Sequence, residues 1–278
     1  MNISNNALKH MLITTKRKQT VAGKAQSQVE SCLLKVDSEK ASITSLTKDL
    51  TGLTHVECAH EGLHSTDNGV FPIPDIDRVL GILALHGGSV NLSYNAGNNK
   101  LVFKSGRKQT TMDASPEGLA FSHSQDTIQD HSERSQGLAG RINAIGGVYT
   151  TADGKEIHSS ACYTVHSTEM FEALRCDNMN GQKFNRYTFS GKDKGLSVLV
   201  GDPSIGGETL TEIEIQGLSP VEPADWQWSF DGGLDELFKQ FAGSCNIHIF
   251  DFTEYQQGMR MAIAFDNGCW AFQSGIIE

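Results

Sequence analysis

The feature that most constrains the fold is a plan of strand, helix, glycine stop and hairpin that occurs twice in the sequence. Residues 70–105 begin with a short apolar run, continue with apolar residues at helical spacing, and end with two runs that alternate apolar and polar residues. Residues 226–272 have the same order. In them, Gly243–Ile249 (GSCNIHI) matches Gly88–Tyr94 (GSVNLSY), with Gly, Ser and Asn in register at an offset of 155 residues. A period this long predicts two similar domains and not a solenoid.

Each copy predicts one helix and one hairpin. In the first copy, Pro74 can open the helix, because the N–H that it lacks would have no partner at a helix start. Gly87 and Gly88 end this helix, and residues 95–99 supply the turn of the following hairpin. The predicted buried side of the helix consists of Ile76, Val79, Leu80 and Leu83, and that of its counterpart consists of Leu234, Leu237, Phe238 and Phe241.

The rest of the chain reads mainly as antiparallel strands. A first helix is predicted from Asn5 or Asn6 to about Gln19, and Ser167 is predicted to cap a third helix. Further strands are predicted at residues 32–36, 41–46, 53–58, 109–113, 161–165, 184–189, 196–200 and 210–215. This pattern predicts an α+β fold in which antiparallel sheet predominates and only four helices are present.

Composition divides the chain into three parts. From about residue 115 to residue 160, Ser, Gln, Asp, His and Gly dominate, which is typical of a linker. We therefore predict a first domain at residues 1–120, an interdomain linker with an insertion at residues 121–160, and a second domain at residues 161–278. A chain of 278 residues is long enough to bury two cores of this size.

Charge is unevenly distributed along the chain. The sequence has 33 acidic and 23 basic residues, for a net charge of −10, which argues against a protein coated with basic surface. The first 29 residues nevertheless contain Lys9, Lys16, Arg17, Lys18 and Lys24 and no Asp or Glu. Such segregation can place a local positive surface on an acidic body.

Nothing in the sequence predicts a membrane protein or a disulfide framework. The longest apolar runs are short and are interrupted by Gly or charged residues, so neither a membrane span nor a signal peptide is expected. The six cysteines contain no Cys-x-x-Cys pair and lie mostly in apolar runs, which favours buried free thiols. We therefore expect a cytoplasmic protein.

The sequence gives no support for an enzyme. It contains no phosphate-binding loop, no dinucleotide fingerprint and no nucleophile elbow. His55, His60 and His64 lie close to Cys58, but this segment runs from a strand into a loop, so successive side chains point to opposite faces. We expect no metal and no cofactor. The alternative is a hydrolase or metal-dependent enzyme that uses His55, Cys58 and His60.

The sequence resembles the DNA polymerase sliding clamps, most closely those of tailed bacteriophages and more distantly proliferating cell nuclear antigen. The likeness rests on residues 71–76 (FPIPDI), which lead into residues 79–85 (VLGILAL), and on the hairpin through Lys100 to Phe103. Residues 226–272 look like the equivalent part of a second clamp domain. The chain departs from the family in its longer linker and in the sparse basic charge of its second half.

This resemblance implies the fold and function of a processivity factor in DNA replication, here viral DNA replication. It implies duplicated clamp domains, with antiparallel sheets outside and four helices lining the inner face of a ring. In phage clamps the ring is a homotrimer of two-domain subunits. Such a ring encircles duplex DNA without reading its sequence and tethers the replicative DNA polymerase after a clamp loader has closed it. A phage-encoded clamp would act in the host cytoplasm.

The resemblance also implies three sets of site residues. Basic residues inside the ring would make weak, mobile contacts with phosphates; they are Lys9, Lys16, Arg17, Lys18, Arg78, Arg175 and Lys239. Edge strands of neighbouring subunits would pair through Gln109, Thr111 and Met112 on one side and Leu196 and Val198 on the other. A pocket for the peptides of partner proteins would include Leu138, Ile142, Ile276 and Ile277.

Two alternatives remain open at this point. The four pocket residues could instead pin the linker and the C-terminal tail to the core. The whole chain could be a structural, β-rich virion component without a DNA-tethering role, which would assemble into large particles that do not depend on DNA.

Overall fold

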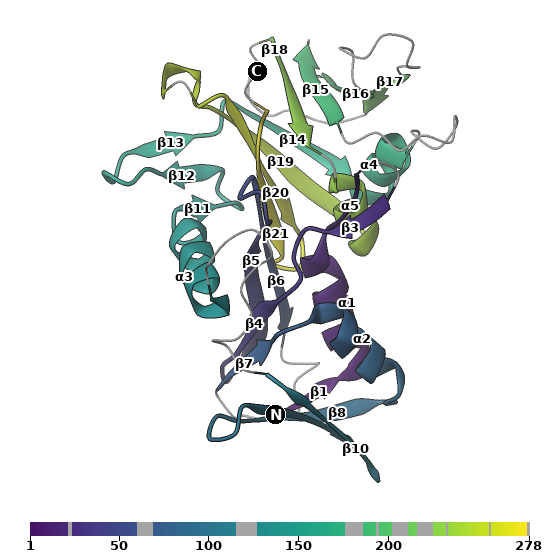
Figure 1. Ribbon diagram of the computed structural model, residues 1–278. Coiled ribbons are helices and arrows are strands. Elements are labelled where there is room, and N and C mark those ends of the chain that lie inside the picture. Colours follow the sequence, from purple (N-terminus) through teal and green to yellow (C-terminus); the bar gives the residue numbers. More distant parts are fainter. Residues whose placement is uncertain are drawn as a thin grey trace. The chain divides into compact units, whose positions relative to one another are not determined.

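The computed structural model describes two compact units, each built around two antiparallel sheets (Figure 1). The first unit comprises Met1–Lys16 and Gln28–Ala139, and the second comprises Arg17–Ser27 and Gly140–Glu278. The residues described are 1–21, 24–59, 69–114, 127–175, 186–192, 195–201, 211–215, 225–231, 233–255 and 257–276.

The first unit contains three helices and two groups of paired strands. Its helices are α1 (Asn5–Lys16), α2 (Ile76–Ala84) and α3 (Ile128–Ala139). One sheet has the order β1 (Asn2–Ser4), β8 (Ser89–Asn95), β9 (Lys100–Ser105) and β10 (Lys108–Asp113). The other strands pair in the order β6 (Gly52–Ala59), β5 (Lys40–Leu46), β4 (Cys32–Val36) and β7 (Gly69–Ile73).

The second unit repeats this order of elements. It has helices α4 (Ser167–Leu174) and α5 (Leu234–Gln240) and a short 3-10 helix at Thr253–Tyr255. Strands β14 (Ala161–His166), β19 (Ser244–Asp251), β20 (Met259–Phe265) and β21 (Trp270–Ser274) pair in this order. A second sheet has the order β17 (Thr211–Ile215), β16 (Gly195–Val200), β15 (Arg186–Lys192) and β18 (Trp226–Asp231). Two smaller sheets are formed by β2 (Lys18–Val21) with β3 (Lys24–Ser27), and by β11 (Ile142–Asn143), β12 (Val148–Thr150) and β13 (Glu156–His158).

The repeated plan in the sequence is therefore present in the structure. In each unit a strand leads into a helix, four strands follow, and a second helix precedes a three-stranded meander. The strand before the first helix pairs with the strand after the second helix, as β1 with β8 and β14 with β19. The predicted α+β class with antiparallel sheets is confirmed.

Helix α1 packs on α2 and on the sheet through a continuous apolar side (Figure 1). Leu8, Met11 and Leu12 are fully buried or nearly so, as are Val79 and Leu83 of α2. The buried Asn5 side chain joins the start of α1 to the end of α2, since its Nδ2 donates to the carbonyl of Leu83 at 2.9 Å and also to that of His86. The geometry of this helix pair is thus fixed at one end by an amide that satisfies two helix-terminal carbonyls.

Three details differ from the prediction. Helix α1 ends at Lys16 and not near Gln19, because Arg17 adopts a left-handed conformation with φ of 41°. His166, and not Ser167, is the cap of α4, since its ring accepts a hydrogen bond from the N–H of Thr168. A fifth helix, α3, lies in the segment that was predicted to be a linker without helices.

Helix α3 is a polar helix that packs against β5 in the first unit. Its buried residues are Ile128, His131, Ser132 and Ser135, and the hydroxyl of Ser135 accepts a hydrogen bond from the N–H of Leu46 at 3.1 Å. Thr127 and Asp130 cap its start reciprocally, each side chain accepting from the other's backbone N–H. Hydrogen bonds, more than apolar burial, position this helix.

None of the helices in the described part of the chain is long and apolar enough to cross a membrane.

Candidate nucleic-acid and subunit interfaces

The two helix pairs carry different charges. Helices α1 and α2 contain Lys9, Lys16 and Arg78 and the single acid Asp77. Helices α4 and α5 contain four acids, Glu169, Glu172, Asp235 and Glu236, against Lys239, with Arg175 directly after α4. The first helix pair therefore carries a net positive charge, and the second a net negative one.

Of the predicted DNA-facing residues in the first part of the chain, three are accessible. Arg78 on α2 and Lys18 on β2 are exposed, and Lys9 on α1 is half-buried. Arg78 also lies close enough to Asp113 for an electrostatic interaction with its carboxylate. The pKa of the exposed Asp113 carboxyl is lowered chiefly by its hydrogen bond and ion pair with Lys100, and to a smaller degree by Arg78.

Lys16 and Arg17 are interior residues, which corrects the prediction that they face DNA. Lys16 is 6% exposed and its ammonium forms an ion pair with Asp77 of α2. Arg17 is 2% exposed and donates from Nη2 to Oε1 of Gln273 at 2.6 Å. These partners are distant in sequence, so the pattern of basic residues alone could not reveal them. Both cations are already neutralised or hydrogen-bonded and do not present a charge to phosphate.

Arg175 and Lys239 are exposed but paired. The Arg175 guanidinium lies 3.4 Å from Glu172, over the ring of Phe171, and the Lys239 ammonium lies 3.5 Å from Glu236. Exposed pairs of this kind are weak, at about 0.2–1 kcal/mol, so either cation can exchange its partner for another anion.

The predicted edge at residues 109–113 is an edge in the structure. Strand β10 is the last strand of the sheet of β1, β8 and β9. Gly106 and Arg107 form a two-residue turn, so Ser105 and Lys108 are the first hydrogen-bonded pair of the hairpin. The N–H of Ala114, six residues after Lys108, donates to the carbonyl of Asn99, which agrees with this register. Alternation then directs the N–H groups of Gln109 and Thr111 away from β9. Both side chains are exposed, whereas Met112 is 3% exposed and belongs to the core.

The predicted partner edge at residues 196–200 is wrong. These residues form β16, which is paired with β15 on one side and with β17 on the other. Leu196 and Val198 are 1% and 0% exposed, and neither can pair with another subunit because both sides of their strand are occupied. The two edge strands of this sheet, as far as it is described, are β17 and β18; Glu212 and Glu214 of β17 are exposed.

Of the four residues predicted for a partner pocket, the three that the structure describes lie in different parts of the chain. Leu138 is half-buried in α3, and Ile142 is buried in β11 opposite Tyr149. Ile276 is half-buried and its N–H donates to the carbonyl of Ser229 at 2.8 Å. Ile277 lies outside the described residues.

The histidines considered for a metal site are only partly described. His55 Nδ1 lies 2.8 Å from the hydroxyl of Thr44, and Nε2 lies 3.4 Å from Glu57. Burial lowers the pKa of His55, against the opposing effect of Glu57. His60 and His64 lie outside the described residues. Within the described ranges, no three His, Cys, Asp or Glu side chains are grouped so that they could hold a metal ion.

None of the described cysteines is part of a disulfide. Cys32, Cys58, Cys162, Cys245 and Cys269 form no disulfide, and Cys176 lies outside the described residues. Burial raises the pKa of Cys245 to about 12 and raises that of Cys32 further. Since the thiolate is the reactive form, these two thiols are inert near neutral pH.

Comparison with known proteins identifies the fold through structure and not through sequence. No model of a known protein family matches the chain, and no curated protein sequence matches it. Solved structures do match. Proliferating cell nuclear antigen from Entamoeba histolytica superposes with a TM-score of 0.60 at 10% identity, over 99% of this chain and 97% of that one.

The chain has the sliding-clamp fold. The beta subunit of DNA polymerase III from Thermotoga maritima superposes with a TM-score of 0.61 at 12% identity, over 100% of this chain and 64% of that one. A protein from Eubacterium rectale provisionally named as a DNA polymerase III beta subunit gives a TM-score of 0.66 at 10% identity, over 99% and 65%. The chain therefore spans almost the whole length of the nuclear antigen but slightly less than two thirds of the two beta subunits.

Proposed function

We propose that this protein is a DNA sliding clamp: a ring that encircles duplex DNA and tethers a replicative DNA polymerase for processive synthesis. The observation that carries the proposal is the sliding-clamp fold itself, in two units that each have a helix pair and an exposed edge strand. In this role the protein is a scaffold and not an enzyme, and it needs neither a metal nor a cofactor.

We further propose that the ring closes by head-to-tail pairing of β10 with β17 of the next subunit. A heterologous contact of this kind gives a closed ring if its rotation closes. Each strand is the last of its described sheet and offers unused backbone groups. The likeness of the sequence to phage clamps favours a homotrimer of phage origin, acting in the host cytoplasm, with domains near residues 1–120 and 161–278.

DNA contact would depend mainly on Lys9, Lys18 and Arg78, with weaker help from Arg175 and Lys239. Phosphate contacts of this type supply affinity that depends on salt but not on sequence, which permits sliding. A clamp loader would open the ring. The polymerase and the loader would bind through short apolar peptides, for which Leu138, Ile142, Ile276 and Ile277 remain the candidate contacts.

Replacing Lys9, Lys18 and Arg78 with glutamine should weaken binding to duplex DNA and leave the assembly state unchanged. Each lost phosphate contact lowers the magnitude of the slope of log K against log salt concentration by about one. The slope of the triple variant should therefore be smaller by about three. Fluorescence anisotropy with a labelled duplex, from low to physiological salt, measures this slope. A control variant in which Arg134, Arg141 and Lys155 are replaced with glutamine has the same net charge as the test variant and should keep the wild-type slope. Equal slopes in the two variants would refute the assignment of these three residues.

A further inference from the structure

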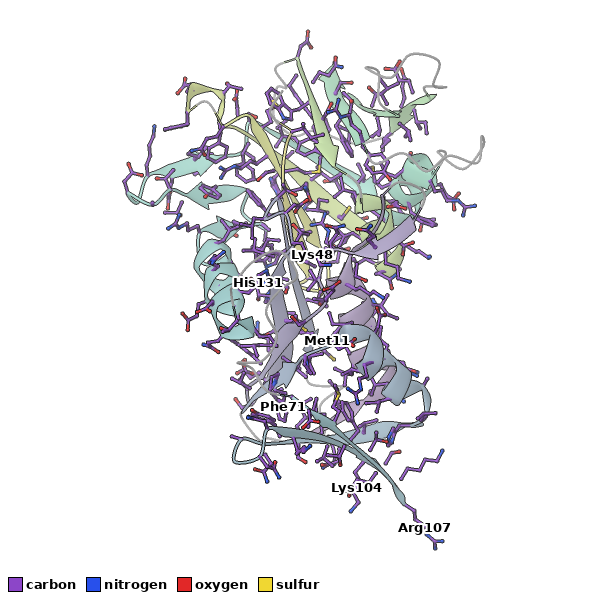
Figure 2. All side chains as sticks on the ribbon, viewed as in Figure 1. Met11, Lys48, Phe71, Lys104, Arg107 and His131 are labelled. Atoms are coloured by element: carbon purple, nitrogen blue, oxygen red, sulfur yellow. The ribbon has the colours of Figure 1, made fainter. Side chains whose placement is uncertain are left out.

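The tip of the β9–β10 hairpin carries a cluster of basic residues. Lys104 ends the exposed face of β9, Arg107 lies in the turn, and Lys108 begins β10; all three are exposed. Figure 2 shows Lys104 and Arg107 at the end of the hairpin, with Arg107 projecting from its tip. Among the described residues, none of the three forms an ion pair with a carboxylate.

The tip is held rigidly by a buried histidine. His86, which is 4% exposed, lies after α2 and contacts both strands of the hairpin: its Nδ1 is 2.7 Å from the hydroxyl of Ser105, and its Nε2 is 3.0 Å from that of Thr110. Lys108 donates to the carbonyl of Leu85 at 3.1 Å, at the end of α2. The charges of Lys104 and Arg107 are thus presented from a fixed position, which lowers the entropy cost of binding an anionic partner.

The described residues beside the tip are polar, and none of those that line the cleft there is acidic. A cleft beside it is lined by Asn2, Ser89, Asn91, Lys104, Ser105 and Gly106. The amide side chains of this cleft lie on the same face of the sheet as Lys104, since Asn2 pairs with Asn91 and Asn91 pairs with Lys104. A partner for this surface must therefore supply negative charge.

The second unit contains a surface with the opposite charge. An open cleft of about 870 Å³ lies at one end of the sheet of β17, β16, β15 and β18. Its lining includes three exposed acids, Glu212, Glu214 and Asp225, and no basic residue among the side chains described there. Ser190 and Ser197 face each other at 2.6 Å, and Glu212 lies 3.5 Å from Ser197.

The two charged surfaces stand beside the two edge strands. The basic tip immediately precedes β10, and two of the cleft acids are side chains of β17 itself. The strand pairs described within each unit are all antiparallel. An antiparallel pairing of β10 with β17 would bring Lys108, at the start of β10, towards Ile215, at the end of β17. Ile215 is one of the residues that line the cleft.

We propose that the basic tip of one copy of this chain enters the acidic cleft of the next copy and fixes the register of the subunit contact. The inference rests on the proposed ring and adds to it a specific electrostatic contact. Charge complementarity of this kind governs register, partner orientation and association rate. It also disfavours the pairing of two identical edge strands, because two basic tips or two acidic clefts would then face each other and repel.

Charge reversal at the two surfaces tests this contact. The variant Lys104→Glu/Arg107→Glu reverses the tip, and Glu212→Lys/Glu214→Lys reverses the cleft. Each alone should weaken assembly at least about tenfold, because like charges then oppose each other. A chain that carries all four substitutions should assemble as the wild type does. In an equal mixture, each variant should bind the other through a matched contact and form mixed pairs that neither variant forms alone, whereas a closed ring of three would keep one mismatched contact. Sedimentation velocity at low and high salt measures these equilibria.

The possible outcomes separate this inference from the proposed function. If neither charge-reversal variant differs from the wild type in assembly, the inference is overturned, but the proposed ring is not. Failure of the fourfold chain to recover assembly would also overturn it, provided that the chain is folded by circular dichroism. Loss of duplex binding by the tip variant, with unchanged assembly, would assign the tip to DNA phosphates instead. A wild type that stays monomeric at every concentration would refute both the ring and the contact.

Discussion

Replacing Thr111 with proline should strongly weaken assembly of the protein while leaving each subunit folded. The N–H of Thr111 points away from β9, so its loss breaks no hydrogen bond within the hairpin. In a pairing with β17, however, proline removes one bond of the ladder and brings its ring against the neighbouring strand. A cost of about 3 kcal/mol corresponds to assembly weakened roughly 100-fold.

The control for this variant is Thr111→Val, which keeps the N–H and a β-branched side chain. It should assemble as the wild type does in analytical ultracentrifugation. The circular dichroism spectrum should be unchanged for both variants, and the melting temperature of the proline variant should fall only by the stabilisation that assembly supplies. A proline variant that assembles normally would exclude β10 from the subunit contact.

Replacing Gly191 with alanine should destabilise the second unit by about 2–4 kcal/mol. Gly191 lies on β15 opposite Trp226, and an added Cβ would come within 2.2 Å of both the Trp226 Nε1 and the Tyr163 hydroxyl. These two groups form a buried hydrogen bond of 3.0 Å that joins the sheet containing β17 to β14. The substitution must therefore displace the indole or separate the two strands.

Tryptophan fluorescence reports this loss selectively. All three tryptophans, Trp226, Trp228 and Trp270, belong to the second unit. Each kcal/mol lowers the melting temperature of a unit of this size by about 2–4 °C. The exposed Gly87, where an added Cβ would meet nothing within 4 Å, provides the control Gly87→Ala. Equal melting temperatures for the two variants would contradict the packing described for Gly191.

Hydrophobic periodicity was sufficient to predict the elements that carry the repeat. Strands β4, β5 and β6 occur within one residue of the predicted ranges, because alternating apolar residues such as Leu34 and Ile43 occupy one buried face. Helix α2 was predicted for a similar reason, since Ile76, Val79 and Leu83 share one buried side.

The features that could not be predicted from the sequence depend on contacts between residues that are distant along the chain. Lys16 reads as one more basic residue on a helix, and only the fold brings Asp77, 61 residues away, to its side chain. Periodicity identifies β16 as a strand but does not show which strands flank it. Two signals were nevertheless present: the nearly continuous apolar run of β16 is typical of a central strand, and the alternating Glu212 and Glu214 of β17 are typical of an edge.

The helix in the predicted linker also left a local signal. Thr127 and Asp130 are spaced as a capping box, which marks a helix start. The residues that follow contain little apolar surface, and the hydrogen bond from Leu46 to Ser135 forms only when the sheet is in place. Composition alone therefore favoured a linker.

Electron microscopy of the purified protein, together with its mass by light scattering, would show whether the subunits form a head-to-tail ring. We expect particles with a central hole and, for three subunits of 30.2 kDa, a mass of about 91 kDa. Compact particles with the mass of one subunit at every concentration, or assemblies without a hole, would contradict it.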